Sequence, residues 1–525
     1  MINEDIKNTY ESVKYKSYSY LHSSIDRLCA TARVYGLEAV LPQSAKVLEI
    51  GCASGGNIIA QAINYPNAEF IGIDLSSAQI KLGVDAIKKL KLQNIKLFDM
   101  DVCDACEKLK GQEFDYIICH GVFSWVPDFV KKAILEIGAK LLSEHGVMMI
   151  SYNVYPGWKY KEPTRDFMRF ASRNIDYEKE PETKLDMALA ALSFEKAVYR
   201  TMPLGESASF QAKTREMKIS NADMIEGLKH NRSYLLHEYL EIFNNPSYLV
   251  DFVADADELG LAYIEDVKLH YDVSEIANST LKEFVNTYFN ERITKDQMFD
   301  FLYSTMFRHS MLTKKANEKD LVFAFDKINA NLDDIFVGFD NQFNALKERA
   351  KGLPMEALAN ALVDNYPNTM SAKELKALVA PGALAEHLFD INAATNGSMY
   401  FSMKKFQKIP YEKNKTKILA SYSKYLEFLN TNKDDIFALS NPLNKTLNLA
   451  NFDFFILSLF DGKRDKDEIL DVAIEYCLKN NTSLNIMKDG KKVELKGKDE
   501  IKQGANESFE KIIYELENNF MLEEI

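Results

Sequence analysis

An acidic residue and several glycines stand close together in "VLEIGCASGGN", residues 47–57. The apolar run at its start is typical of a buried strand, and the segment after it is typical of a helix, so the glycines fall in a strand-to-helix turn. Glycine lets the backbone approach a ligand that a Cβ atom would obstruct. The spacing predicts a small-molecule site with contacts from Glu49, Gly51, Cys52, Ala53, Gly55 and Asn57.

Two further carboxylates follow at the ends of the next predicted strands. Asp74 ends "EFIGID", where it can accept hydrogen bonds from both hydroxyls of a ribose, and Asp101 ends the third strand, where it can accept from an adenine amino group. This order is close to the E-x-G-x-G-x-G turn of class I S-adenosylmethionine (SAM) methyltransferases, with Ala53 in place of the middle glycine. The nicotinamide-type G-x-G-x-x-G register is absent. We expect SAM as cofactor, S-adenosylhomocysteine as product, and contacts from Asp74, Leu75, Gln79, Asp101 and Val102.

The segment "CHGVFSWVPD", residues 119–128, follows the fourth predicted strand. Methylases that act on base amines often carry a D/N-P-P-Y/F/W motif at this place, so its absence makes a nucleic-acid base a less favoured acceptor. Gly121 is expected to let the backbone pass close to the cofactor. In-line methyl transfer does not demand a base, so His120 is interpreted as a lining residue. Predicted cofactor contacts here are His120, Gly121, Val122 and Trp125, with core packing as the alternative for Trp125.

Candidate acceptor groups follow the fifth strand and end a helical segment. Ligands of open α/β sheets bind at the carboxyl ends of the strands, which favours "SYNVYPGW", residues 151–158. The segment "HEYL", residues 237–240, ends the helical insert, where polar groups can face an acceptor; a helix with one solvated face is the alternative. The candidates are Tyr152, Asn153, Trp158, His237 and Glu238.

Regular alternation of strands and helices over residues 46–155 predicts a doubly wound parallel sheet. The fold class is α/β, Rossmann-like, with residues 156–245 as a helical lid. Residues 246–320 complete the sheet. Residues 321–525 combine helices with a hairpin at Asp489-Gly490, which suggests an α+β, winged-helix-like region.

The composition is that of a soluble globular protein, with 46% hydrophobic and 27% charged residues. A net charge of −13 argues against nucleic acid as a partner. Six scattered cysteines form no disulfide framework, and "CDAC" at 103–106 lacks a second pair, so no metal is expected. The polar N-terminus and the lack of a long apolar run predict a cytoplasmic protein without a membrane span.

The chain resembles bacterial methyltransferases that carry a methyltransferase regulatory domain, a group that includes rickettsial lysine methyltransferases of outer-membrane proteins. The resemblance rests on "YKSYSYLHSSIDRLCATARVYGL", "VLEIGCASGGN", "FIGIDLSSAQI", "FDYIICHGVFSWVP", "GVMMISYNVYPGW", "LLHEYLEIFNNPSYLVDFV", "FRHSMLTK" and "LFDGKRDKDEIL". It implies that residues 1–45, with Tyr15 and Tyr18, form a cap over the cofactor. It also implies that the acceptor is a lysine of a protein and that the chain forms a homodimer.

Three functions are compatible with these residues. The first is methylation of protein lysine side chains, which the resemblance implies, whereas the residues themselves indicate only the use of SAM. The second is a small-molecule methyltransferase with a closed apolar pocket, and the third is a non-catalytic SAM-binding regulator. An acceptor groove wide enough for a polypeptide favours the first function, and a closed cavity of a few hundred Å³ favours the second.

Overall fold

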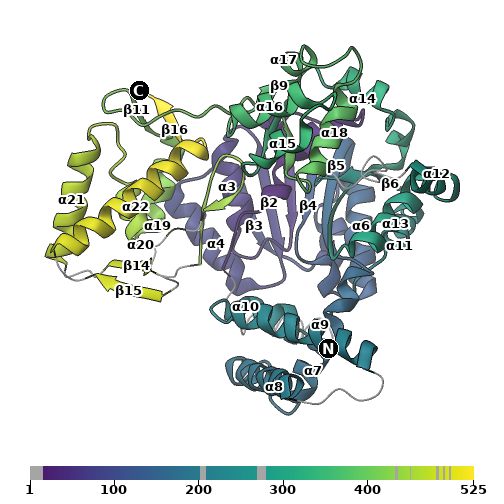
Figure 1. Cartoon of the computed structure of the whole chain (residues 1–525), viewed down its shortest axis with the longest axis horizontal. Helices are drawn as coiled ribbons and strands as arrows, with labels where there is room; N and C mark the ends of the chain where they lie inside the picture. Colours follow the sequence, from purple (N-terminus) through teal and green to yellow (C-terminus); the bar gives the residue numbers. More distant parts are fainter. Residues whose placement is uncertain are drawn as a thin grey trace.

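A seven-stranded sheet with the order β3-β2-β1-β4-β5-β7-β6 forms the centre of the molecule (Figure 1). The computed structural model describes residues 16–201, 208–268, 279–431, 436–447, 449, 451–480, 484–488, 491–495 and 498–525. Strands β1 to β5 are parallel, and β7 is antiparallel to both β5 and β6. The predicted Rossmann-like sheet, completed after a helical insert, is confirmed. Its strands are β1 (Lys46–Ile50), β2 (Glu69–Asp74), β3 (Ile95–Asp99), β4 (Phe114–Cys119), β5 (Leu142–Asn153), β6 (Leu261–Asp266) and β7 (Phe307–Lys314).

Each face of the sheet carries its own apolar core. Successive side chains of a strand point to opposite faces, so Val47 and Tyr116 join one buried cluster while Leu48 and Ile117 join the other. Helices α2, α3 and α4 contribute to the first cluster, and α5, α6 and α11 to the second. The helices are α2 (Ile25–Val34), α3 (Gly56–Asn64), α4 (Ser77–Leu90), α5 (Val102–Lys108), α6 (Asp128–Leu141) and α11 (Leu249–Glu258).

Local signals set the limits of two of these helices. Ser76 precedes α4, and its hydroxyl accepts a hydrogen bond from the backbone amide of Gln79 at 3.3 Å. Gly260 follows α11 with φ of +84°, a left-handed conformation that favours glycine. Both positions fix where a helix meets a strand and thus hold the loops at the sheet edge in place.

A helical insert follows β5 and lies below the sheet in the view of Figure 1. Its elements pack around their own apolar cluster, which includes Met168, Leu185, Leu192 and Tyr239. The last element is a π-helix, which is rare and often accompanies functional sites. The insert consists of η4 (Gly157–Tyr160), α7 (Glu162–Ala171), α8 (Pro181–Thr201), α9 (Ala208–Gly227), α10 (Arg232–Leu235) and η5 (Leu236–Leu240).

A buried guanidinium ties the two antiparallel strands to the helix between them. Arg308 on β7 donates to Asp266 at 2.8 Å and to both oxygens of Asp300 at 3.0 and 2.9 Å. These three side chains are at most 1% exposed. The two ion pairs therefore compensate charges that would otherwise be costly to bury. Arg308 therefore has a structural role. The helices between β6 and β7 are α12 (Ser279–Tyr288) and α13 (Arg292–Tyr303).

The C-terminal region adds many short elements above and to the left of the sheet in Figure 1. The strands are β8 (Phe336–Phe339), β9 (Met370–Ser371), β10 (Met399–Ser402), β11 (Thr416–Ile418), β12 (Leu439–Ser440), β13 (Thr446–Leu447), β14 (Leu484–Lys488), β15 (Lys491–Leu495) and β16 (Leu522–Glu524). The helices are α14 (Phe325–Asn331), α15 (Ala345–Ala350), α16 (Glu356–Asn365), α17 (Ala372–Lys376), α18 (Leu384–Ala394), α19 (Ala420–Thr431), α20 (Asn451–Leu457), α21 (Lys466–Lys479) and α22 (Lys498–Asn518).

The predicted hairpin is present as the antiparallel pair β14 and β15, although its Asp489-Gly490 turn lies outside the described residues. Strands β10, β8 and β9 form a separate antiparallel sheet. The winged-helix character of this region remains a prediction. Among the described residues, the helices lack the combination of length and hydropathy that a bilayer span requires.

An N-terminal cap, residues 16–45, is fastened to the C-terminal region. Ser17 forms a parallel β-bridge with Phe437, and the hydroxyls of Ser19 and Thr446 are 2.9 Å apart. Asn444 donates its side-chain amide to the carbonyl of Tyr20, also at 2.9 Å. The cap contains η1 (Leu21–Ser23) and η2 (Pro42–Ser44) besides α2. Residues more than 400 positions apart in sequence thus meet beside the turn that follows β1.

Candidate cofactor and acceptor site

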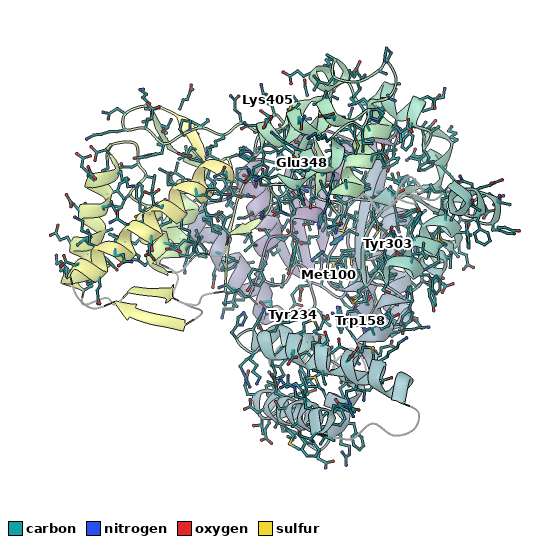
Figure 2. The ribbon with its side chains drawn as sticks, viewed as in Figure 1. Met100, Trp158, Tyr234, Tyr303, Glu348 and Lys405 are labelled. Carbon is teal, nitrogen blue, oxygen red and sulfur yellow. The ribbon has the colours of Figure 1, made fainter. Side chains whose placement is uncertain are left out.

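A cavity of about 600 Å³ opens at the carboxyl ends of β1, β2, β4 and β5. The cap borders it on one side and the insert on another. Met100 lies at the sheet, and Trp158 and Tyr234 lie on the part of the insert that faces the sheet (Figure 2). Nearly all residues predicted for the site line this one space. They are Tyr18, Glu49, Gly51, Cys52, Ala53, Asn57, Asp74, Leu75, Gln79, Asp101, Val102, His120, Gly121, Val122, Trp125, Asn153, Trp158, His237 and Glu238.

Two predicted residues lie away from the cavity. The Tyr152 side chain is 1% exposed, stacks on Phe252 with ring centroids 4.3 Å apart, and has its hydroxyl 3.1 Å from that of Ser310. Successive side chains of a strand point to opposite faces, so Tyr152 points into the core while its neighbour on β5, Asn153, faces the cavity. Gly55 is not among the residues that line the cavity, and a Cβ atom built on it would come within 3.0 Å of the Leu97 side chain. Tyr15 lies outside the described residues.

Left-handed backbone conformations curve the turn after β1 around the cavity. Gly51 and Gly55 have φ of +70° and +81°, and Ala53 adopts +48° although it carries a side chain. The Ala53 amide donates to Asp74 at 2.8 Å, which compensates for this conformation. At Gly56, the first residue of α3, a Cβ atom would stand 2.5 Å from the carbonyl oxygen of Ser17. Gly56 therefore allows the cap to lie directly on the turn.

Asp74 is held by the backbone at the end of β2. Its Oδ2 accepts from the amide of Ala53 and its Oδ1 from the amide of Ser76, both at 2.8 Å. Burial raises the pKa of Asp74, whereas the two amide bonds oppose the rise. Each oxygen keeps one lone pair, so the carboxylate can also accept two hydroxyl hydrogen bonds. Asp101 caps α5 by accepting from the Cys103 amide at 2.9 Å while lining the cavity.

Glu49 brings an incompletely satisfied carboxylate to the cavity. Its Oε1 accepts from the side-chain amide of Asn57 at 2.7 Å, but its Oε2 is buried without a hydrogen-bond partner among the described residues. Burial raises the pKa of Glu49 to about 8, and the charge of Asp74 adds to the rise. A cationic ligand beside Oε2 would favour the ionised form and remove this penalty. The residues present therefore fit a cofactor that carries positive charge.

His120 stands among aromatic rings where β4 ends. Its ring centroid is 3.8 Å from that of Tyr20, 5.9 Å from the stacked His309 and 6.2 Å from Phe307. Burial lowers the pKa of His120 to about 3, with a further contribution from His22, so the imidazole is neutral at ordinary pH. A group so difficult to protonate is a poor proton acceptor, which agrees with its interpretation as a lining residue.

Gly121 leaves room beside His120. Its φ is +70°, its amide donates to the Ser151 hydroxyl at 2.8 Å, and a Cβ atom built on it would meet nothing within 4 Å. Since Gly121 lines the cavity, the backbone at this point is open to a ligand. The turn after β4 thus supplies space, and the carboxyl ends of β1 and β2 supply acidic acceptors.

Aromatic and acidic side chains of the insert line the opposite end of the cavity. Trp125 and Trp158 meet edge to face with ring centroids 6.2 Å apart. Lys161 places its Nζ atom 4.5 Å from the centroid of the Trp158 ring and 2.8 Å from Oε1 of Glu238. Glu238 lies on the π-helix η5, beside His237, whose Nδ1 is 3.3 Å from Glu241. We call this the acceptor end.

Sequence reasoning missed several lining residues, among them Lys16, Ser17, Met100, Lys161, Tyr234, Glu241, Met306 and Phe307. For Lys161 a signal existed: it follows Trp158 by three positions, a spacing that brings side chains together on one helical face. For Phe307 and Ser17, only the tertiary fold reveals proximity to the cavity.

Comparison with known proteins agrees with this architecture. Residues 42–199 match a model described as a methyltransferase domain, and residues 231–314 match a predicted methyltransferase regulatory domain. An uncharacterised Rickettsia prowazekii protein is 26% identical over 98% of this chain and 94% of its own length. A second one is 34% identical over 49% of this chain and 97% of its own length. The structure of PKMT2 from Rickettsia typhi in complex with AdoHcy has the same fold, with a TM-score of 0.73, 24% identity, and coverage of 97% and 99%.

Proposed function

Because the chain belongs to the SAM-dependent methyltransferases that carry a methyltransferase regulatory domain, we propose that it methylates lysine side chains of a protein. SAM is its methyl donor, and when bound it supplies an electrophilic methyl group on a positively charged sulfur. Little acid–base chemistry is needed beyond this, so the chain must chiefly position the two reactants.

The cofactor end would hold SAM through its acidic groups. Asp74 would accept from the ribose hydroxyls, and Asp101 would face the adenine amino group. Glu49, whose Oε2 lacks a hydrogen-bond partner among the described residues, would balance the positive charge of the methionine moiety. The open space at Gly121 would admit the cofactor close to the backbone.

The observation that carries the lysine proposal is the composition of the acceptor end. An alkylammonium is recognised by a carboxylate together with aromatic faces, and Glu238 and Trp158 line the cavity side by side with an ammonium between them. A carboxylate acceptor would be repelled by Glu238 and Glu241. PKMT2 from Rickettsia typhi, which has the same fold, was solved in complex with AdoHcy, and this supports the use of SAM.

A lysine ε-amine must lose a proton before it can attack, because its ordinary pKa is about 10.4. Desolvation in the cavity and the nearby positive sulfur would both lower that pKa. Glu238 would orient the ammonium by a charged hydrogen bond and pass its proton toward solvent.

The decisive experiment is incubation of the purified protein with methyl-labelled SAM and a lysate of the source organism. We expect label in protein and, after hydrolysis, in methyl-lysine. Label confined to small molecules would replace the proposal by a small-molecule methyltransferase, for which a cavity of this volume is also suitable. SAM binding by calorimetry without any transfer would instead indicate a regulator. The Asp74→Ala variant serves as the control for transfer that depends on the cofactor site.

Three further parts of the proposal rest on the resemblance and on composition. We propose a homodimer, which a monomer mass in light scattering would reject, and a winged-helix-like C-terminal region. We also propose a cytoplasmic location, consistent with six cysteines that are all unpaired.

A further inference from the structure

Lys161 is the one lysine at the acceptor end among the cavity-lining residues that the structure describes. Its side chain is 15% exposed, that of Glu238 is 14% exposed, and the Trp158 residue is 2% exposed. The ammonium contacts both the carboxylate and the indole face within this shielded space. An alkylammonium therefore already sits where the proposed reaction needs one, and it belongs to the chain itself.

Lys159 shows that this placement is specific to one lysine of the segment. Only two positions earlier, its Nζ atom contacts the Tyr248 hydroxyl at 2.8 Å and lies over the rings of Tyr155 and Tyr248. Lys159 is exposed and is not among the residues that line the cavity. Both lysines make cation–π contacts, but of the two only Lys161 lines the cavity.

We propose that Glu238 and Trp158 form the binding site for the acceptor's alkylammonium group, and that Lys161 fills this site until an acceptor displaces it. The inference rests on the proposed function, since lysine methylation requires an alkylammonium acceptor. It goes further by identifying Lys161 as an internal competitor that occupies the site and must be displaced.

The electrostatics of the exchange support this assignment. A carboxylate left alone in a largely shielded cavity would pay a desolvation penalty, which Lys161 removes while no acceptor is present. An incoming lysine replaces one ammonium by another, so Glu238 is paired before and after the exchange. The cost of the arrangement is competition: the apparent affinity for an acceptor falls by the fraction of molecules in which the site is already filled.

Tryptophan emission offers a direct test in the full-length, cofactor-free protein. The chain contains two tryptophans, Trp125 and Trp158, and both line the cavity. The probe is n-butylammonium, which copies the end of a lysine side chain, and n-butanol serves as its uncharged analogue. We expect Lys161→Ala to bind n-butylammonium about tenfold more tightly than the wild type, with no gain for n-butanol.

Matched variants make the outcome decisive. Lys159→Ala should bind like the wild type, and Glu238→Gln added to Lys161→Ala should abolish the gain. Lys161→Met, which keeps the aliphatic stem, replaces the alanine variant if thermal melting shows that the latter is unfolded. A folded Lys161 variant that binds no more tightly than the wild type would overturn the inference, as would a gain that survives Glu238→Gln.

The result is separable from the test of the proposed function. If lysate proteins acquire methyl-lysine but the emission titrations show no gain, the enzyme methylates lysine and the binding site lies elsewhere. If the titrations succeed while label enters only small molecules, the alkylammonium site stands and the protein acceptor is rejected.

Discussion

At its cofactor end the cavity is lined by residues at the ends of strands and in the turns that follow them, whereas its acceptor end is lined mainly by side chains of the helical insert. Asp74 is positioned by two backbone amides from neighbouring turns. Glu238 is positioned by the side chain of Lys161, from the other end of the insert. The first arrangement is fixed once the sheet forms, while the second depends on pairs of side chains that can exchange partners. The two ends should therefore respond differently to substitution.

The largest effect is expected at the cofactor end. Asp74→Ala removes the predicted ribose acceptor, and loss of hydrogen bonds to a charged group should weaken SAM binding by about 3 kcal/mol, on the order of a hundredfold. Calorimetric titration measures the change. Asp85→Ala, on the exposed side of α4, is the control and should bind SAM normally. Equal affinity of the Asp74 variant would defeat the ribose assignment.

Glu238→Gln should impair the acceptor end of the cavity and leave the cofactor end unaffected. Loss of the charge should lower kcat/KM for a protein acceptor by roughly tenfold to a hundredfold, because a hydrogen bond to a charged group contributes about 1.5–3 kcal/mol. SAM affinity should not change. Steady-state kinetics and calorimetry on the same preparation provide both values. A parallel fall in SAM affinity would mean that the two ends are not independent.

Gly121→Ala tests the open backbone beside His120. Gly121 and Gly111 have φ of +70° and +81°, and a Cβ atom would meet no protein atom within 4 Å at either. Both alanine variants should lose about 1–2 kcal/mol of stability from the left-handed conformation. Only Gly121→Ala should also weaken SAM binding, by about tenfold, because only Gly121 lines the cavity. Unfolding curves and calorimetry distinguish the two effects, and equal SAM affinities would remove Gly121 from the site.

Glu49 should give the ligand-free protein a distinctive pH dependence. Its pKa rises on folding from an ordinary value of 4.5 to about 8 because of burial. As the pH increases through this interval, the unfolded chain has lost the proton that the folded chain retains, so the free energy of unfolding falls. Glu49→Gln should remove this component. Urea unfolding across the interval checks the prediction, and an unchanged slope in the variant would contradict it.

The smallest effect is expected at Asp101, which both caps α5 and faces the cavity. Asp101→Ala should reduce stability by about 1 kcal/mol through loss of the cap. Asp101→Ser keeps a capping oxygen and should restore most of that stability, but not an adenine contact. Thermal melting reports the cap, and calorimetry with SAM reports the contact.

The contrast between the two ends also explains what the sequence could predict. Glu49 and Asp74 lie in the last residues of strands and Asp101 lies shortly after one, and the apolar pattern of these strands is local, so the motif and its position can be predicted together. In the structure, side chains alternate along β5, so Tyr152 lies in the core and Asn153 faces the cavity. The sequence could not predict which of the two faces the cavity, because a continuous apolar run does not show which side of the sheet each residue occupies. Lys161 and Glu238 are 77 positions apart, and no local pattern predicts their contact.

The fastening of the cap to residues near 440 has a consequence for the newly made protein. A chain that leaves the ribosome exposes β1 and α3 long before Phe437 and Asn444 have been added, and N-terminal domains generally fold first during synthesis. The sheet can therefore form early, but the covering over its Gly-rich turn cannot be secured until the C-terminal region arrives. Prematurely terminated translation products would contain the turn after β1 without the C-terminal contacts that hold the cap over it, and we expect them to bind SAM less tightly than the full-length chain.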